Sequence, residues 1–269
     1  MTSRNNNSIV KTSANSDGIL RITLNNPKNH NALSEEMMLN IQLALDEAAA
    51  DKKIRVIIIS AEGPTFSAGH DLKELKAGRK NSDKGKGYFK EVMLKCSKLM
   101  QSIVNNPKPV ISEVAGVATA AGCQLVASCD LAYAGESAKF ATPGVNIGLF
   151  CSTPMVALSR NVSNKHSMEM LLTGDLISSS KAAEIGLINK MINDNDLQNF
   201  VLERALKISK KSAMTLKIGK EAFYKQIDMT LSEAYDYASN VMVENMLKLD
   251  AEEGIDAFIN KRTPNWQDK

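Results

Sequence analysis

Two segments of the 269-residue chain are rich in small side chains and resemble loops that offer backbone amides to a ligand. The first runs from Phe66 to Lys73, and the second from Gly116 to Leu125. Small side chains let a backbone N–H point into a cleft, and the start of a helix leaves its first N–H groups unpaired. Such amides can hold an oxygen that gains negative charge during a reaction. Tight packing of strand against helix is the alternative explanation for each segment taken alone.

Other common classes of site are not supported. The second segment matches neither G-x-x-x-x-G-K-[ST] nor G-x-G-x-x-G, and the chain has no G-x-S-x-G elbow. This argues against a nucleotide-binding protein and a serine hydrolase. The cysteines and histidines lack the spacing of zinc ligands, so we predict no metal site and a reducing compartment. They are Cys96, Cys123, Cys129, Cys151, His30, His70 and His166.

Composition and charge narrow the class of protein further. Hydrophobic residues make up 43% of the chain and charged residues 23%, as in ordinary globular proteins. With 33 basic and 30 acidic residues, the net charge of +3 creates no strong field for nucleic-acid binding. No apolar run approaches the roughly 20 residues of a membrane-spanning helix. We therefore predict neither a nucleic-acid partner nor a membrane span.

The elements that must position the two segments alternate between strand and helix. Alternating or β-branched apolar runs predict strands at 18–25, 54–60, 109–116 and 130–136. Ser34 is a predicted N-cap, and a second helix carries Cys96 on its apolar stripe before Pro107. The charged, glycine-rich residues 76–87 predict a mobile surface loop. This order predicts a largely parallel α/β core.

Beyond residue 150 the pattern becomes helical, and no strand of any length is predicted after about residue 193. Thr230 with Glu233, and Asp250 with Glu253, have the spacing of capping boxes. We predict three parts: a flexible polar tail over 1–16, an α/β core over 17–193 and a helical segment over 194–269. The predicted helices cover 154–172, 178–186, 195–209, 213–227, 230–249 and 250–262.

Six motifs in the same order give the chain a resemblance to the enoyl-CoA hydratase/isomerase, or crotonase, superfamily. It extends from about residue 17 to 266. The motifs are N-x-P-x-x-x-N-A-L at 25–33, F-S-A-G-x-D-L at 66–72, V-A-G-x-A-x-x-A-G at 114–122, C-D-x-A at 129–132, L-T-G-x-x-I-S-S-x-x-A-x-x-x-G-L at 172–187 and E-G-x-x-A-F-x-x-K-R at 253–262. The resemblance implies a ClpP-like spiral of ββα units with a helical C-terminal trimerisation segment, often paired into hexamers.

The resemblance also implies an acyl-CoA thioester as ligand, with coenzyme A as part of the substrate and no separate cofactor. Two backbone N–H groups of such proteins hold the thioester oxygen as it acquires enolate charge. By position these are the amides of His70 and Ala121. A donor of this kind contributes about 3 to 4 kcal/mol to transition-state stabilisation.

The predicted acid and base are where the sequence departs from the family. Hydratases of the family carry glutamates at the positions of Gln124 and Gly144, and neither residue here can titrate. Cys151 and Ser152 lie in the loop that lines the acyl pocket in relatives, together with Asn146 and Thr153. Pocket lining is the expected role of both, and catalysis is the alternative.

Further residues are assigned by the same resemblance. The His70 imidazole is expected to be polar lining, Asp71 to stabilise a turn, and Asp130 to bind backbone. Independently of the resemblance, Tyr224 and Phe258 fall on helical stripes and are expected in the core rather than stacked on an adenine. The methionines from Met242 to Met246 are expected in helix packing. The predicted CoA and substrate contacts are Lys28, Asn29, His30, Ala68, Asp71, Leu72, Lys73, Lys261 and Arg262.

These features predict an acyl-CoA-binding protein of fatty-acid metabolism with atypical or weak enolate chemistry. The alternative is a non-catalytic acyl-CoA binder or regulator that keeps the pocket. A homotrimer or a dimer of trimers is the expected assembly. The compartment depends on the source: cytoplasmic in a bacterium, and the mitochondrial matrix in a eukaryote, because the acid-poor N-terminus is only a weak transit-peptide signal.

Overall fold

Two β-sheets organise the core of the computed structural model, which describes residues 8–269. In the larger sheet β1 is antiparallel to β2, and every other neighbouring pair is parallel. In the smaller sheet β4, β6 and β8 are parallel, and β9 is antiparallel to β8. In spatial order the larger sheet contains β1 (Val10–Ala14), β2 (Ile19–Leu24), β3 (Val56–Ala61), β5 (Val110–Val114), β7 (Leu131–Gly135) and β10 (Lys190–Ile192). The smaller sheet contains β4 (Thr65–Ser67), β6 (Val117–Thr119), β8 (Lys139–Ala141) and β9 (Ile177–Ser178).

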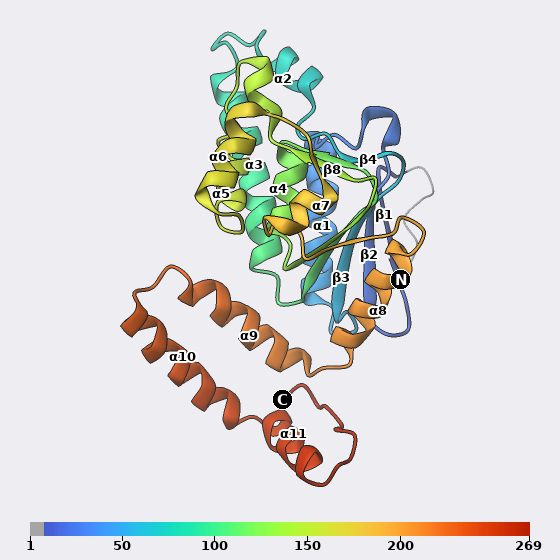
Figure 1. Cartoon of the computed structure of the whole chain (residues 1–269), viewed down its shortest axis with the longest axis vertical. Helices are drawn as coiled ribbons and strands as arrows, with labels where there is room; N and C mark the ends of the chain where they lie inside the picture. The colour runs from blue at the N-terminus through green and yellow to red at the C-terminus, as the bar shows by residue number, and fades with distance from the viewer. Residues whose placement is uncertain (1–7) are drawn as a thin grey trace.

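Both faces of the larger sheet are covered by helices. One face packs against α1 (Glu35–Ala50), α3 (Lys86–Val104) and α4 (Ala121–Ser128), and the other against α8 (Leu197–Ser209) (Figure 1). Ile57 and Ile59 of β3 belong to the first apolar cluster, and Val56 and Ile58 to the second. The predicted strand buried on both faces is therefore confirmed.

The remaining helices are short or lie in the C-terminal part. They are η1 (Pro27–Asn29), α2 (Leu72–Gly78), η2 (Pro143–Ile147), α5 (Pro154–Leu158), α6 (Asn164–Thr173), α7 (Ser179–Glu184), α9 (Ala213–Gln226), α10 (Leu231–Met246) and α11 (Leu249–Ile259). No helix of the described residues is long and apolar enough to cross a bilayer.

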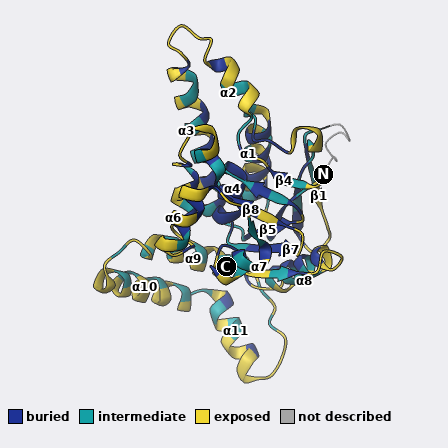
Figure 2. Cartoon of the chain, turned by 45° about the horizontal axis from the view of Figure 1, so that its top comes forward, coloured by how far each residue is buried: buried dark blue, intermediate teal, exposed yellow. Residues whose placement is uncertain are grey.

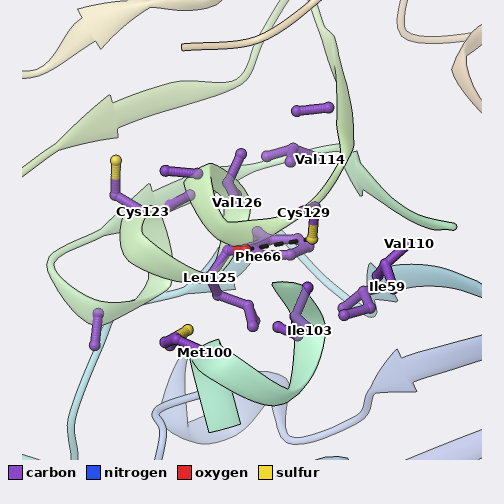
Figure 3. Packing of buried hydrophobic residues seen from close by; sticks show 14 of the residues in the cluster. Ile59, Phe66, Met100, Ile103, Val110, Val114, Cys123, Leu125, Val126 and Cys129 are labelled. Carbon is purple, nitrogen blue, oxygen red and sulfur yellow. Dashed lines mark hydrogen bonds between the residues drawn. The ribbon is translucent and has the colours of Figure 1, made fainter. Parts of the chain in front are cut away.

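Close packing fixes the position of α4. Leu125 points toward Met100 and Ile103 of α3, and Phe66 of β4 lies beside Leu125 and Cys129 (Figure 3). The Cys129 thiol donates to the carbonyl oxygen of Leu125 at 3.3 Å. Because these side chains are buried in one cluster, α4 cannot shift without disturbing both β4 and α3.

Helices α9, α10 and α11 form an arm that extends away from the core (Figures 1 and 2). Neither α9 nor α10 contains a buried residue, whereas the core is densely buried. The methionines Met242 and Met246, predicted to pack between helices, are exposed. Phe258, predicted to lie in the core, is 85% exposed. That prediction is wrong because no other part of the described chain covers the side of α11 that carries Phe258.

Four other predictions made from local sequence patterns differ from the structure. Val10–Ala14 forms strand β1 on the edge of the larger sheet, so the flexible tail predicted over 1–16 is wrong there, and residues 1–7 lie outside the described part. The loop predicted at 76–87 is shorter, because α3 begins at Lys86. The helix predicted over 154–172 is divided into α5 and α6.

The second predicted capping box is also wrong. Asp250 lies within α11, and its carboxylate accepts from the backbone N–H groups of Gln267 and Asp268. Glu253 binds Arg262 instead of the start of the helix. By contrast, the capping box of Thr230 and Glu233 is confirmed at the start of α10.

Candidate functional site

The ends of three parallel strands bring the main candidate residues to one edge of the smaller sheet. Strands β4, β6 and β8 are neighbours, with Ser67 of β4 opposite Ala118 of β6. His70 lies in the loop after β4, Ala121 begins α4 just after β6, and Thr142 follows β8 directly. We refer to the edge formed by His70, Ala121 and Thr142 as the strand-end site.

Two glycines allow the first two loops to approach each other. Gly69 has φ +87°, and a Cβ atom there would lie 2.9 Å from the Cβ of Ala120 and 3.1 Å from the nitrogen of Ala121. A Cβ atom at Gly122 would overlap the carbonyl oxygen of Ser67. Any side chain would push the loops apart, so backbone contacts set the distance between them.

The amides of His70 and Ala121 donate to no other group of the described chain. Ala120, the N-cap of α4, has φ 50° and ψ −120°, a conformation that costs a non-glycine residue about 1–3 kcal/mol. Its own N–H donates to the carbonyl oxygen of Ala141 at 2.9 Å, which ties the turn to the end of β8. The turn thus leaves the Ala121 amide unpaired at the positive end of α4.

His70 is half-buried, and both nitrogens of its ring are buried. Neither ring nitrogen has a hydrogen-bond partner within the described residues. Burial lowers the pKa of His70 from its ordinary value, and the neighbouring Leu33 carbonyl, which opposes this shift, is not placed for a hydrogen bond. The imidazole is therefore neutral at pH 7, with one nitrogen able to donate and the other able to accept.

Gln124 is 5% exposed and lies in the first turn of α4. Its backbone N–H donates to the carbonyl oxygen of Ala120 at 3.0 Å. The Cys96 thiol on α3 lies 3.9 Å from the side-chain oxygen Oε1 of Gln124. Cys96 belongs to the buried core, as predicted from the stripe of its helix.

Gly144 is buried against Cys151. A Cβ atom at Gly144 would lie 2.9 Å from the Cys151 sulfur and 2.8 Å from the carbonyl oxygen of Leu149. The N–H of Gly144 donates to the same sulfur at 3.3 Å. Cys151 thus fills the space that the first carbon of a side chain at position 144 would need.

The environment of Cys151 and Ser152 does not activate either as a nucleophile. Burial raises the pKa of Cys151, and the hydrogen bond from Gly144 opposes this only in part. The thiolate is the reactive form, so Cys151 remains a protonated thiol at neutral pH. Ser152 is exposed, and its hydroxyl donates to the carbonyl of Phe150 at 3.4 Å. Asn146 is exposed and Thr153 half-buried in the same loop.

The loop that carries Lys28, Asn29 and His30 borders the segment after β4. His30 accepts from the Ala68 backbone N–H at 3.1 Å through its carbonyl oxygen, and its ring nitrogen Nδ1 lies 3.2 Å from the Thr65 hydroxyl. All three predicted contact residues of this loop are exposed. The structure therefore brings this loop next to the strand-end site, although the side chain of Asn29 already donates to the side-chain oxygen of Asn26 at 3.3 Å.

The residues that follow His70 have separate local roles. Asp71 is the N-cap of α2, and its carboxylate accepts from the Lys73 backbone N–H at 2.7 Å. This agrees with the turn-stabilising role predicted for Asp71. Ala68, Leu72 and Lys73 are exposed.

Lys261 and Arg262 lie beyond α11, in the arm and apart from the strand-end site of the same chain (Figure 1). Arg262 is held by a two-pronged ion pair with Glu253, at 2.7 and 2.8 Å, and by Asp256. Lys261 is exposed. One chain alone does not bring these residues to the predicted ligand.

A buried ion pair that sequence reasoning missed joins the arm to the core. The Lys220 ammonium group of α9 donates to Asp130 at 2.7 Å and to the carbonyl oxygens of Ile103 and Lys108. The Tyr224 hydroxyl donates to the other oxygen of Asp130 at 2.9 Å, so Tyr224 joins the arm to the core. Lys220 and Tyr224 are one helical turn apart, a spacing that could have indicated a shared partner.

Asp130 also accepts from the backbone N–H of Val110 at 2.7 Å, which confirms its predicted bond to the backbone. Sequence reasoning also missed Thr142 as a residue of the strand-end site. Its place directly before Pro143 could have drawn attention to it. Among the described residues, no group of three or more histidine, cysteine, aspartate or glutamate side chains could hold a metal ion.

The sequence pattern of the enoyl-CoA hydratase/isomerase family matches residues 14–269, and the chain belongs to this family. The crystal structure of an enoyl-CoA hydratase from Mycobacterium smegmatis is 41% identical, with a TM-score of 0.91 over 96% of this chain and 98% of that chain. The predicted crotonase fold is thereby confirmed.

Among its relatives are proteins called enoyl-CoA hydratase domain-containing protein 3. The rat protein, named as mitochondrial, is 49% identical over 250 residues, which cover 93% of this chain and 82% of the rat protein. The crystal structure of the human protein is also 49% identical, with a TM-score of 0.90 over 95% of this chain and 99% of that chain. Segments such as SAGHDLKEL at 67–75 pointed to this branch of the family.

Proposed function

We propose that the chain binds an acyl-CoA thioester at the strand-end site and that the amides of His70 and Ala121 form its oxyanion hole. The observation that carries this proposal is the pair of unpartnered amides on two turns that are locked together at Gly69 and Gly122. Two amides fixed at one edge can hold a carbonyl oxygen as it becomes an enolate oxygen. Each contributes about 3 to 4 kcal/mol of transition-state stabilisation.

The proposed chemistry is atypical or weak enolate chemistry rather than conventional hydration. Gln124 and Gly144 offer no group that can gain or lose a proton. A positioned acid or base is worth about 10² to 10⁴ in rate, so hydration by a pair of glutamates is not available to this chain. Isomerisation, decarboxylation, thioester hydrolysis or slow hydration can each proceed through a thioester enolate.

The phosphates of coenzyme A are proposed to meet basic residues around the site. Lys28 and Lys73 are exposed beside it and can reach an anionic group as flexible point charges. From another copy of the chain, Lys261 is the better candidate, because Arg262 is already engaged by Glu253 and Asp256. No separate cofactor is proposed.

The arm is proposed to make a homotrimer, or a dimer of trimers. Support comes from the apolar side chains that α10 and α11 leave exposed, among them Val243, Met246 and Phe258. Introducing charge with Val243→Glu and Met246→Glu is expected to lower the mass of the assembly, measured by light scattering. Lys248→Glu on the same arm is the matched control. In a eukaryote we propose the mitochondrial compartment named for the relatives.

The second candidate function is a non-catalytic acyl-CoA binder or regulator. The observation that favours it is that neither Gln124 nor Gly144 supplies a titratable group near the two amides. A screen of purified protein against short, medium and branched acyl-CoAs separates the candidates when turnover and thermal stabilisation are read together. Stabilisation without turnover supports the binder. Neither binding nor turnover with any thioester contradicts both candidates.

Restoring the carboxylates tests the proposed loss of hydratase chemistry. The triple variant Gln124→Glu, Gly144→Glu, Cys151→Ala removes the clash with the Cys151 sulfur and supplies both acids, while the Leu149 carbonyl oxygen, 2.8 Å from the new Cβ position, must still shift. We expect crotonyl-CoA hydration to rise by at least about 100-fold over the parent. The same variant with Cys151 retained is the control and should gain less, because the Cys151 sulfur lies 2.9 Å from the new Cβ position. Rapid hydration by the unaltered protein would refute the proposal.

A further inference from the structure

Unpaired buried polar atoms are concentrated at the strand-end site. In the described chain, the buried side-chain nitrogen and oxygen atoms without a hydrogen-bond partner belong to three residues: His70 at both ring nitrogens, Thr142 at its hydroxyl and Arg204 at Nε. The Arg204 guanidinium lies over the Phe200 ring, 4.7 Å from its centre, on the opposite side of the larger sheet, where α8 packs. The other three atoms lie at one edge of the smaller sheet.

Leaving such groups unpaired is unfavourable to folding. A buried donor or acceptor without a partner typically costs about 1–3 kcal/mol. Thr142 is only 1% exposed, so bulk water does not compensate its hydroxyl. Unfavourable groups of this kind gather where a ligand supplies the missing partners.

The topology places the two residues on either side of β6, the strand that leads to the Ala121 amide. His70 follows β4 and Thr142 follows β8, and β6, which leads to Ala121, lies between those strands. Two strand spacings separate the outer strands by about 10 Å. The Ala120 amide bonds Ala141, directly before Thr142, and Gly69, directly before His70, packs on Ala120. The ends of an acyl thioester can therefore meet both residues while its carbonyl lies between them.

We propose that the His70 imidazole is the proton-transferring group of this site and that the Thr142 hydroxyl hydrogen-bonds the bound thioester. This inference rests on the proposed thioester function and names side chains that replace the two glutamates. The Leu33 carbonyl, in the loop that precedes α1, opposes the lowering of the His70 pKa but is not placed for a hydrogen bond to the ring. Both ring nitrogens therefore lack a partner within the described chain.

The proton transfer needs no further reactant. The unprotonated ring nitrogen of His70 removes a proton from the carbon next to the thioester carbonyl. The electron pair of that C–H bond forms the enolate, whose oxygen the two amides hold. The imidazolium then returns the proton, either to the same carbon or to the γ-carbon of a β,γ-unsaturated ester. Atoms and charge balance in both outcomes.

Proton exchange measures this step separately from any complete reaction. Purified full-length protein is mixed with but-3-enoyl-CoA in D₂O, and deuterium at the α-carbon is followed by NMR, with affinity measured in parallel by calorimetry. His70→Gln retains the backbone amide and is expected to slow exchange by at least about 100-fold without loss of affinity. His166→Gln, on the half-exposed surface of α6, is the matched control and should match the parent.

Thr142→Val tests the role of Thr142 independently of His70, because it should change stability and affinity in opposite directions. Removing an unpaired hydroxyl should raise the melting temperature of the ligand-free protein by roughly 2–4 °C. The same change should weaken but-3-enoyl-CoA binding by about three- to tenfold, since one neutral hydrogen bond is lost. A merely structural threonine would not show stabilisation together with weaker binding.

The outcomes separate this inference from the proposed function. If proton exchange persists in His70→Gln, the proposed role of His70 is wrong. The same conclusion follows if the unaltered protein binds the thioester but exchanges no proton. Unchanged affinity in Thr142→Val overturns the role of Thr142. If the unaltered protein binds no thioester at all, the proposed function itself fails.

Discussion

The strand-end site and the C-terminal arm differ in how far their residues are buried within one chain. At the site, glycines bring backbone against backbone, and side chains such as Gln124 and Thr142 are almost fully buried. In the arm, α9 and α10 bury no residue, and α11 leaves Phe258 exposed (Figure 2). The site is complete in its backbone within one chain. The arm leaves its apolar side chains uncovered.

The ion pair of Lys220 with Asp130 is one of the contacts that join these two regions, beside that of Arg55 with Asp268. Lys220 reaches from α9 to Asp130, which lies just beyond the C-terminal end of α4, the helix whose first residue is Ala121. The arm is therefore fixed to the core close to α4, the helix whose Ala121 amide is a candidate hydrogen-bond donor. Its orientation depends on a few polar atoms rather than on a broad apolar surface.

The largest expected effect comes from breaking this link. Lys220→Met leaves Asp130 buried without its ion-pair partner, which should lower the free energy of unfolding by about 3–5 kcal/mol. Chemical denaturation measures the change. Lys217→Met, exposed on the same helix, should change it by less than about 0.5 kcal/mol.

Amide hydrogen exchange of the Lys220→Met protein measures whether the arm and the core unfold together. If only residues 213–226 lose protection, the arm unfolds separately from the core. If protection falls throughout, the two regions form one cooperative unit. A Lys220→Met protein as stable as its parent would contradict the importance of the link.

A pair of identical substitutions should have effects of opposite sign in the two regions. Gly122→Ala introduces a methyl group against the Ser67 carbonyl and should destabilise the fold by about 1–3 kcal/mol. Gly219→Ala lies inside α9 with no atom near the new carbon, and should stabilise by about 0.5–1 kcal/mol. Thermal unfolding of both variants tests the pair. A neutral Gly122→Ala would show that the loops are not locked by close contact.

The smallest effect is expected at the end of the arm. The Arg262 guanidinium, helped by the Asn265 N–H, lowers the pKa of Glu253 to about 2 from 4.5. A carboxyl with a lowered folded pKa stabilises the fold above its unfolded pKa, so this contribution should fall between about pH 4.5 and 2. Arg262 is exposed and Glu253 half-buried at the end of the arm, so only local loosening is expected. NMR of the Asn265 amide should show it, and Glu253→Gln should abolish the pH dependence.

Sequence reasoning succeeded where a pattern was local and strongly periodic. The helix after Ser34 and the apolar strand at Val56–Ala61 were found because each repeats one signal over several residues. Strand β1 was missed because it lies on the sheet edge, where Val10 is its one buried residue and the rest is polar enough to resemble a tail. Edge strands need few apolar residues, so their pattern is weak.

The errors in the arm have a different cause. Asp250 looked like a cap because the signal is local, but its partners are Gln267 and Asp268 in the returning tail. At the site, motifs identified His70 and Ala121, whereas the lack of partners for the His70 ring and for Thr142 is a property of three-dimensional surroundings. Spacing along a chain cannot report such surroundings.

The contact of Gly122 with the Ser67 carbonyl has a consequence for how this family can change. The spacing of the two amides is determined by main-chain atoms, so most side-chain replacements nearby leave it intact. In the proposed oxyanion hole, the residue at position 124 can therefore change without moving the two amides. A change at position 144 needs a compensating change at Cys151, because the first carbon of any side chain there would meet that sulfur. The proposed binding of the thioester oxygen and the acid–base chemistry can thus change independently of each other.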